Sequence, residues 1–267
     1  MGILNVTPDS FFDGGKYVTE KSILEKVGQY LAEGAEIIDL GGASSKPGAS
    51  EISAKEEAAR LLPALEIILN NFPNAIVSID TFRSDIAKIC IENGASIIND
   101  ISGGNFDSKM FETIAKLNVP YILMHIQGTP QTMQQNPVYE NILMDIAKEF
   151  SVKLSKLHQL GVNDIIVDPG FGFGKTTAQN YELLNQLEYF TSFNKTIMVG
   201  FSRKSMVNKV LNIGAKEAVN GTTVLNTIAL MKGAKILRVH DVKEAVEAIN
   251  LFSSLSKNNL EASNQRK

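Results

Sequence analysis

The sequence predicts an α/β fold, a (β/α)8 TIM barrel that forms one domain over residues 1–255, with its active site at the C-terminal ends of the strands. Eight short apolar runs recur along the 267 residues, and a polar or ionisable residue ends or closely follows each run. Segments with helical periodicity separate the runs and are long enough to cross over between parallel strands. The runs are nearly continuous in Ile, Leu and Val, which is typical of strands covered on both faces and disfavours a β-sandwich.

The expected strands, in chain order, are Ile3–Asn5, Ile37–Asp39, Val77–Asp80, Ile97–Asp100, Ile122–His125, Ile165–Asp168, Ile197–Gly200 and Ile236–His240. Residues 53–56 have the form of a capping box, which opens a helix expected over Glu57–Asn70 with Pro63 inside it. Four helices are expected to end at a glycine in the left-handed conformation, at Gly34, Gly94, Gly161 and Gly233. Residues 256–267 are polar and are expected to form a frayed tail.

Composition narrows the class of partner. The formal net charge is −3 and no long basic run is present, so the sequence indicates neither nucleic acid nor an anionic membrane as a partner. Small molecules are the expected ligands. The single cysteine, Cys90, lies in a helical stretch and is interpreted as a small buried apolar residue.

Location and chain ends give two further expectations. The chain contains no apolar stretch of about 20 residues and no leader-like segment, so a cytoplasmic location is expected. Because the first strand begins at Met1 and leaves no residues to close the base of the barrel, the native chain is expected to extend before Met1.

A polar set is expected around the mouth of the barrel, where active-site groups of this fold gather. The set comprises Asn5, Asp39, Asp80, Asn99, Asp100 and Asp168. Any one of these residues can simply terminate a strand, because Asp and Asn favour turns. Six of them at one end favour a site, since carboxylates and amides pair with the donor edge of a nitrogen heterocycle such as a pterin.

A basic set follows the last two strands, where barrels often bind phosphate. It comprises Arg203, Lys204, Arg238 and His240, which suit a phosphate or pyrophosphate. Two alternatives remain open. Arg203 can be a solvated surface charge, and the side chains of Arg238 and His240 can belong to a structural ion pair at the rim.

The glycine-rich segment 168–176 is not a P-loop, because Pro169 stands where that motif requires glycine. Either Phe171 or Phe173 is available to stack on a flat ligand, and core packing is the alternative for one of them. The scattered histidines have no zinc spacing, whereas Mg²⁺ needs only one or two protein oxygens, which Asn5 can supply. Three long loops, at 7–19, 41–52 and 126–141, are expected to bind substrate.

Seven separated segments carry a family resemblance: Gly2–Phe11, Ser78–Thr81, Ile98–Asp100, Leu123–His125, Asp168–Lys175, Gly200–Ser205 and Arg238–Asp241. On these segments the chain resembles the dihydropteroate synthases, folate-pathway enzymes targeted by sulfonamides, from Met1 to about Ile249. The first and fifth segments are the most specific. The resemblance implies that 4-aminobenzoate displaces pyrophosphate from 6-hydroxymethyl-7,8-dihydropterin pyrophosphate to give 7,8-dihydropteroate.

The resemblance also implies roles for individual residues. Those implied to hold the pterin are Asp80, Asn99, Asp168 and Lys204, with Met124 on the ring face. Those implied to bind pyrophosphate with Mg²⁺ are Asn5, Arg238 and His240, with Asn5 as the metal ligand. The implied aminobenzoate site comprises Phe173, Ser205 and the loop with Ser45, Lys46 and Pro47, and Gly200 belongs to the same substrate-binding set. The implied catalytic residues are Asp80, Lys204, Arg238 and His240.

One departure from the family pattern lies in the second long loop. The family usually has Gly-Gly-Glu-Ser-Thr-Arg-Pro-Gly, and this chain has Ala43 in place of the glutamate and Lys46 in place of the arginine. Lysine lacks the planar fork of arginine, so we expect turnover to persist with altered affinity for substrates or sulfonamides. The alternatives are a non-catalytic or altered-specificity pterin-binding paralogue and a barrel of the methyltetrahydrofolate methyltransferase type.

A homodimer is expected by analogy with the family. The helix over Thr222–Met231 is a candidate for the interface, and its apolar residues can equally belong to the core.

Overall fold

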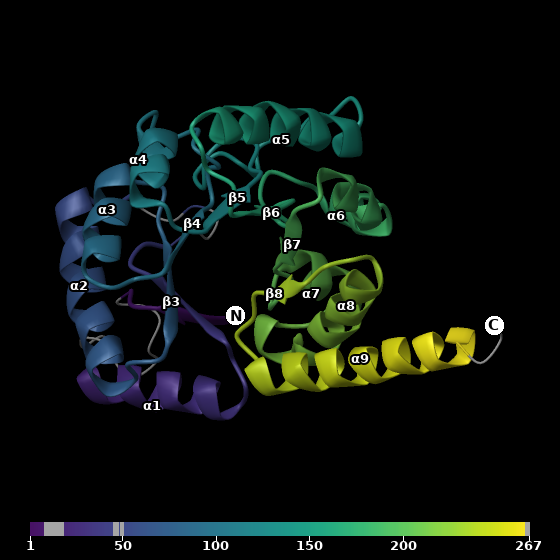
Figure 1. Ribbon diagram of the computed structural model, residues 1–267. Helices are drawn as coiled ribbons and strands as arrows, with labels where there is room; N and C mark the ends of the chain where they lie inside the picture. The colour runs from purple at the N-terminus through teal and green to yellow at the C-terminus, as the bar shows by residue number, and fades with distance from the viewer. Residues whose placement is uncertain (8–18, 45–47, 49–50, 265–267) are drawn as a thin grey trace.

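The computed structural model describes residues 1–7, 19–44, 48 and 51–264, with side chains as far as residue 255. It confirms the barrel: the strands are parallel and pair in chain order from β1 to β8 (Figure 1). They are β1 Gly2–Asn5, β2 Ile37–Gly41, β3 Ile76–Asp80, β4 Ile97–Asp100, β5 Tyr121–Met124, β6 Ile165–Asp168, β7 Thr196–Val199 and β8 Ile236–Leu237.

The last strand is shorter than the expected Ile236–His240. After Leu237 the chain leaves β7 and pairs with β1. The Val239 N–H donates to the Met1 carbonyl (3.0 Å), and the Val239 carbonyl accepts from the Ile3 N–H (2.9 Å). These two bonds close the barrel between its last and first strands.

The helices surround the barrel on its outer side (Figure 1). They are α1 Glu20–Ala32, α2 Ala54–Asn71, α3 Ser84–Glu92, α4 Met110–Leu117, α5 Ile142–Gln159, α6 Thr177–Asn185, α7 Ser205–Leu211, α8 Val219–Met231 and α9 Val242–Asn264, with short 3-10 turns η1 Leu187–Phe193 and η2 Ala215–Glu217. The four glycines expected to end helices all have positive φ, between 84° and 99°. Cys90 is buried, as expected.

One expected helix boundary was wrong. Helix α2 begins at Ala54, three residues before the expected start, because the Ser53 hydroxyl accepts the Glu56 N–H and so caps the helix there. The Glu56 carboxylate contacts Arg60 instead of completing a capping box. Helix α9 continues to Asn264, so the backbone is helical through most of the segment expected to fray.

The barrel interior is layered. Ile97, Ile122, Ile166 and Met198 form an apolar cluster inside the barrel, and Met1, Ile37 and Ile236 pack against it. A larger core lies between the sheet and the helices. The polar strand ends lie above the inner apolar cluster, so the interior is closed below the mouth and open to a ligand only from the carboxyl ends. Among the described residues, no helix is long and apolar enough to span a membrane.

Candidate active site

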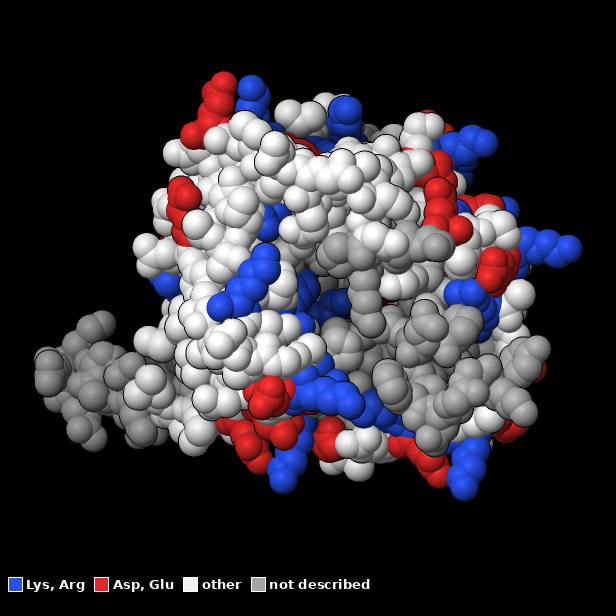
Figure 2. Space-filling model, turned by 180° about the vertical axis from the view of Figure 1, so that it is seen from behind, with Lys and Arg blue, Asp and Glu red and all other residues white. Residues whose placement is uncertain are grey.

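Strand register places the predicted polar residues at one height. Asn5 pairs with Gly41, Gly41 with Asp80, and Asp80 with Asn99, so a single row crosses the first four strands. On the other side Met124 pairs with Asp168. Figure 2 faces this end of the barrel, where Lys and Arg side chains are visible in a hollow near the centre.

Arg238 joins two buried carboxylates in the mouth. Its Nε donates to Asp39 (2.6 Å) and its Nη2 to Asp80 (2.8 Å). In this structure Arg238 therefore forms structural ion pairs, which is one of the two interpretations offered by the sequence. Burial raises the pKa of Asp80 to about 7, although the nearby Arg238 guanidinium opposes the shift. Asp80 therefore exchanges its proton near neutral pH.

Asn99 has one satisfied and one unsatisfied side-chain group. Its Nδ2 donates to both carboxylate oxygens of Asp39, at 3.1 and 3.3 Å. Its Oδ1 is buried and has no hydrogen-bond partner among the described residues. An unpaired buried acceptor costs free energy, so this oxygen is an unsatisfied group in the mouth.

Asp168 and Lys204 form the opposite wall. Burial raises the pKa of the Asp168 carboxyl, whereas Lys204 and the Gly170 N–H oppose the shift. Burial lowers the pKa of Lys204 to about 8, and Asp168 opposes that change. The Lys204 Nζ donates to the Phe171 carbonyl and lies 4.7 Å from the centre of the Phe173 ring. Gly200 lies beside these residues, since a Cβ there would lie 3.4 Å from the Arg238 backbone carbonyl and 3.8 Å from the Lys204 Nζ.

The structure separates the two phenylalanines that the sequence left equivalent. Phe171 is fully buried in the main core and packs on Phe201, with ring centres 4.6 Å apart. Phe173 belongs to a small apolar cluster with Met124 and Ile101 beside the mouth. Only Phe173 is therefore available to a ligand in the mouth.

Other members of the basic set lie at the rim. His240 is held through its Nδ1, 3.0 Å from the Ser202 hydroxyl. Arg203 forms an ion pair with Asp241 and is 39% exposed, in agreement with a surface charge outside the mouth. Ser205 is the exposed first residue of α7.

Asp100 does not join the site. Its carboxylate accepts from the Ser102 N–H and hydroxyl, the Gly104 N–H and the Tyr121 hydroxyl. These bonds stabilise the turn after β4, so for Asp100 the interpretation as a strand terminator is correct. The predicted loop residues Ser45, Lys46 and Pro47 lie outside the described residues.

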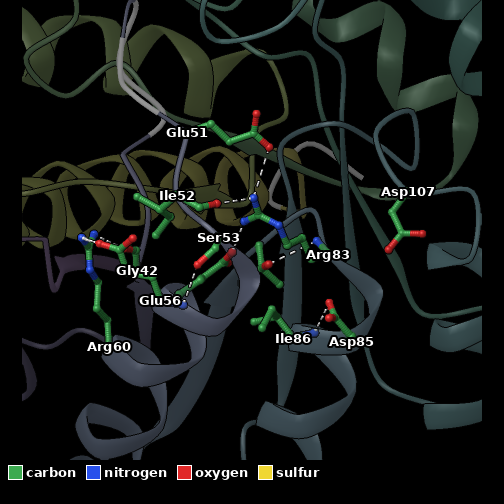
Figure 3. Close-up of polar contacts among 12 residues, drawn as sticks. Gly42, Glu51, Ile52, Ser53, Glu56, Arg60, Arg83, Asp85, Ile86 and Asp107 are labelled. Atoms are coloured by element: carbon green, nitrogen blue, oxygen red, sulfur yellow. Dashed lines mark hydrogen bonds and ion pairs between the residues drawn. The ribbon is translucent and has the colours of Figure 1, made fainter.

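Sequence reasoning missed an anchor of the second long loop (Figure 3). Arg83, three residues after β3, donates to the Ile52 carbonyl (2.7 Å) and contacts the buried carboxylate of Glu57. Arg60 donates to the Gly42 carbonyl (3.0 Å). Together, the two arginines hold both described ends of the loop beside a cavity of about 170 Å³ that Asp80 and Arg83 line. Only the nearness of Arg83 to a strand end could have indicated this role.

Loss of the Arg83 guanidinium is expected to be strongly destabilising. Arg83→Met leaves Glu57 buried without its cation, which should lower the free energy of unfolding by about 3–5 kcal/mol, measured by urea denaturation. Lys88→Met, which removes an exposed ion pair with Glu92, should change it by less than about 1 kcal/mol. Equal effects of the two substitutions would contradict the anchoring role.

The barrel and its mouth define a class of protein, a pterin-binding enzyme, and the family model for pterin-binding enzymes matches residues 1–240. The chain is 42% identical to the dihydropteroate synthase of Escherichia coli (strain K12) over 256 residues, which cover 95% of this chain and 90% of that protein. It is 40% identical to the Streptococcus pyogenes serotype M3 enzyme, with 96% of this chain and 94% of that protein covered.

Solved structures agree. The sulfonamide complex of Yersinia pestis dihydropteroate synthase has a TM-score of 0.91 at 40% identity and covers 96% of this chain and 93% of that one. The Xanthomonas albilineans enzyme with 4-aminobenzoic acid has a TM-score of 0.89 at 31% identity, covering 96% and 92%. This chain belongs to the dihydropteroate synthases, transferases of folate biosynthesis, and the family resemblance inferred from its motifs is confirmed.

Proposed function

We propose that the mouth binds the pterin of 6-hydroxymethyl-7,8-dihydropterin pyrophosphate through Asp80, Asn99, Asp168 and Lys204, with Met124 against the ring face. The unpaired Oδ1 of Asn99 is the observation that carries this proposal. It lies at the height of Asp80 and offers an acceptor to a ring N–H. Asp168, on the facing wall, supplies further acceptors.

The pyrophosphate is proposed to lie near Asn5, Arg238 and His240, with Mg²⁺. The described residues contain no cluster of three or more His, Cys, Asp or Glu that could hold a metal. That fits Mg²⁺, which takes few protein oxygens beside substrate phosphates. The Asn5 Oδ1 borders a space that a side chain at Gly41 would fill, since a Cβ there would lie 3.0 Å away. The bound ion would neutralise the charge that grows on pyrophosphate.

The acceptor, 4-aminobenzoate, is proposed to lie against Phe173, near Gly200 and Ser205. The Xanthomonas albilineans structure contains 4-aminobenzoic acid, which supports this choice of acceptor. The loop with Ser45, Lys46 and Pro47 is assigned to the same site on family resemblance alone.

The transfer breaks the bond between the exocyclic methylene carbon and the pyrophosphate oxygen and joins that carbon to the amine nitrogen, which then releases one proton to solvent. The arylamine attacks with its own lone pair, so no residue has to act first as a general base. Arg238 and His240 would stabilise the leaving group, whereas Asp80 would favour the cationic character left on the methylene. The remaining task of the mouth is to orient the amine and exclude water.

Pyrophosphate release tests this proposal. The protein would be mixed with the pterin pyrophosphate and Mg²⁺, with and without 4-aminobenzoate, and both products quantified. Release that requires the amine and equals the dihydropteroate formed is the expected result. Tight pterin binding without any product would overturn the proposal.

Asn99 gives a test of pterin recognition that is separate from turnover. Asn99→Leu removes the unpaired acceptor, so the affinity for the pterin pyrophosphate should fall about 10- to 100-fold, as expected for about 1–3 kcal/mol. Equilibrium binding is measured by pterin fluorescence in a protein that contains no tryptophan. Asn93→Leu, at the exposed end of α3, is the matched control and should leave the affinity unchanged.

A homodimer through α8 and α9 is also proposed, and a cytoplasmic location remains the expected one. Helix α8 buries Leu225, Ala229 and Leu230 in the barrel core. Its other side and α9 expose Met231 (67%) and Leu251 (75%) beside a groove of about 750 Å³. An exposed apolar face of this kind suits a second copy of the chain.

The charge substitution Leu251→Glu should convert the dimer to a monomer, because it places a carboxylate in the apolar interface. Analytical ultracentrifugation gives the mass. Val152→Glu, on the exposed side of α5, is the matched control and should leave the dimer intact. A parent protein that sediments as a monomer would refute the interface.

A further inference from the structure

The buried ammonium of Lys175 has no role in the proposed transfer. Lys175 is 2% exposed and ends the glycine-rich turn after β6. Its Nζ donates to the carbonyls of Gly170 (2.9 Å) and Phe173 (3.0 Å), and it lies 3.0 Å from the Nδ1 of His125. An ammonium group has three N–H donors, so these contacts occupy all of them.

Burial lowers the pKa of Lys175 to about 7, and when its ammonium is present His125 can take part only as an acceptor toward it. Burial and the nearby lysines lower the pKa of His125, so the imidazole is neutral. With Nδ1 accepting, the proton lies on Nε2, which is 3.5 Å from a carboxylate oxygen of Glu149 on α5. Glu149 in turn contacts Lys153. A continuous polar chain therefore connects α5 to the turn.

The turn fits tightly against the end of β5. Gly170 has a φ of +72°, and a Cβ there would lie 1.9 Å from the His125 carbonyl oxygen. The Asp168 carboxylate accepts the Gly170 N–H (2.8 Å), and the Gly170 carbonyl accepts both the Phe173 N–H (3.1 Å) and Lys175. The second half, which carries Phe173, is bonded to Lys175 through the Phe173 carbonyl.

We propose that Lys175 is a positioning residue for the acceptor substrate: its bonds to the Gly170 and Phe173 carbonyls fix the backbone that directs the Phe173 ring into the mouth. The inference rests on the proposed function, in which 4-aminobenzoate lies against that ring. Asp168 keeps its own bond to the Gly170 N–H, so the charge of Lys175 acts on the pterin contacts only through space and its main effect is expected on the amine.

Steady-state kinetics with both substrates test the inference. Lys175→Met should raise the KM for 4-aminobenzoate about tenfold, while kcat and the KM for the pterin pyrophosphate change less than about threefold. Lys195→Met is the matched control, because that lysine donates to the Asn163 carbonyl at the opposite end of the barrel. It should change none of the three constants.

A double-mutant cycle shows whether Lys175 acts through Phe173. If it does, Lys175→Met should raise the amine KM less than about twofold in a Phe173→Leu background. Independent structural damage would instead raise this KM by the same factor in both backgrounds. Lys175→Gln, whose amide can still donate to both carbonyls, should restore most of the amine affinity. Lys175→Asn, whose amide is too short to reach both carbonyls, takes the place of Lys175→Met in the cycle if that variant fails to fold.

Equal factors in the two backgrounds, or an unchanged amine KM in the folded variant that enters the cycle, would overturn the inference. Failure of the proposed function is recognised separately, because the unsubstituted protein would then release no amine-dependent pyrophosphate.

Discussion

Arg238→Met should lower turnover about 10³-fold, the largest loss expected from a single substitution. The guanidinium is the cation proposed to stabilise the leaving pyrophosphate, and loss of such a group removes stabilisation made mainly in the transition state. The same change leaves the buried Asp39 and Asp80 without their shared partner. We therefore also expect a lower free energy of unfolding, by about 3–5 kcal/mol.

Two controls separate these effects. Arg238→Lys keeps the charge but not the fork that reaches both carboxylates, so its turnover should lie between those of the parent and the methionine variant. Arg203→Met removes a rim arginine paired with Asp241 and should change turnover less than about twofold. Near-parental pyrophosphate release by folded Arg238→Met would exclude the proposed role.

Asp80→Asn should lower kcat about 10²-fold and change the pH dependence of the reaction. The asparagine keeps the size of the side chain and one acceptor oxygen but removes the charge that favours a cationic methylene. Because the pKa of Asp80 is about 7, the parent carboxylate forms as the pH rises through that value. The parent kcat/KM should therefore fall as the pH drops below about 7.

Lys204 is expected to set the alkaline limit of the pH profile of kcat/KM. Its pKa is about 8, so its cation is lost as the pH rises above that value, and kcat/KM should be highest between the two values. Asp80→Asn should lack the acidic decline, whereas the alkaline one should persist. An acidic decline of the same size in Asp80→Asn would assign it to another group.

The placement of the mouth residues could be predicted because strand ends are visible in the sequence. Asp80, Asn99 and Asp168 each end an apolar run, and parallel strands bring such ends together. The sequence could not show which of two adjacent polar residues at a strand end belongs to the site. Asp100 follows Asn99 directly, yet its carboxylate is used within its own turn.

Two kinds of contact left no signal in the sequence. Arg83 and Lys175 each donate to backbone carbonyls, and a carbonyl is present at every position. The pairing of Arg238 with Asp39 joins residues 199 positions apart, and many acidic residues were equally available. Such contacts depend on the assembled barrel and not on a local pattern.

The Arg238 bridge means that the guanidinium is already paired with two carboxylates before any substrate arrives. A ligand that draws the guanidinium toward pyrophosphate exchanges old bonds for new ones, and its measured affinity is the difference between the two sets. An inhibitor that engages Asn99, Asp168 and Lys204 but leaves both arginine bonds intact avoids that exchange. Inhibitor design on this scaffold can therefore treat the arginine and its two carboxylates as a fixed wall of the pocket.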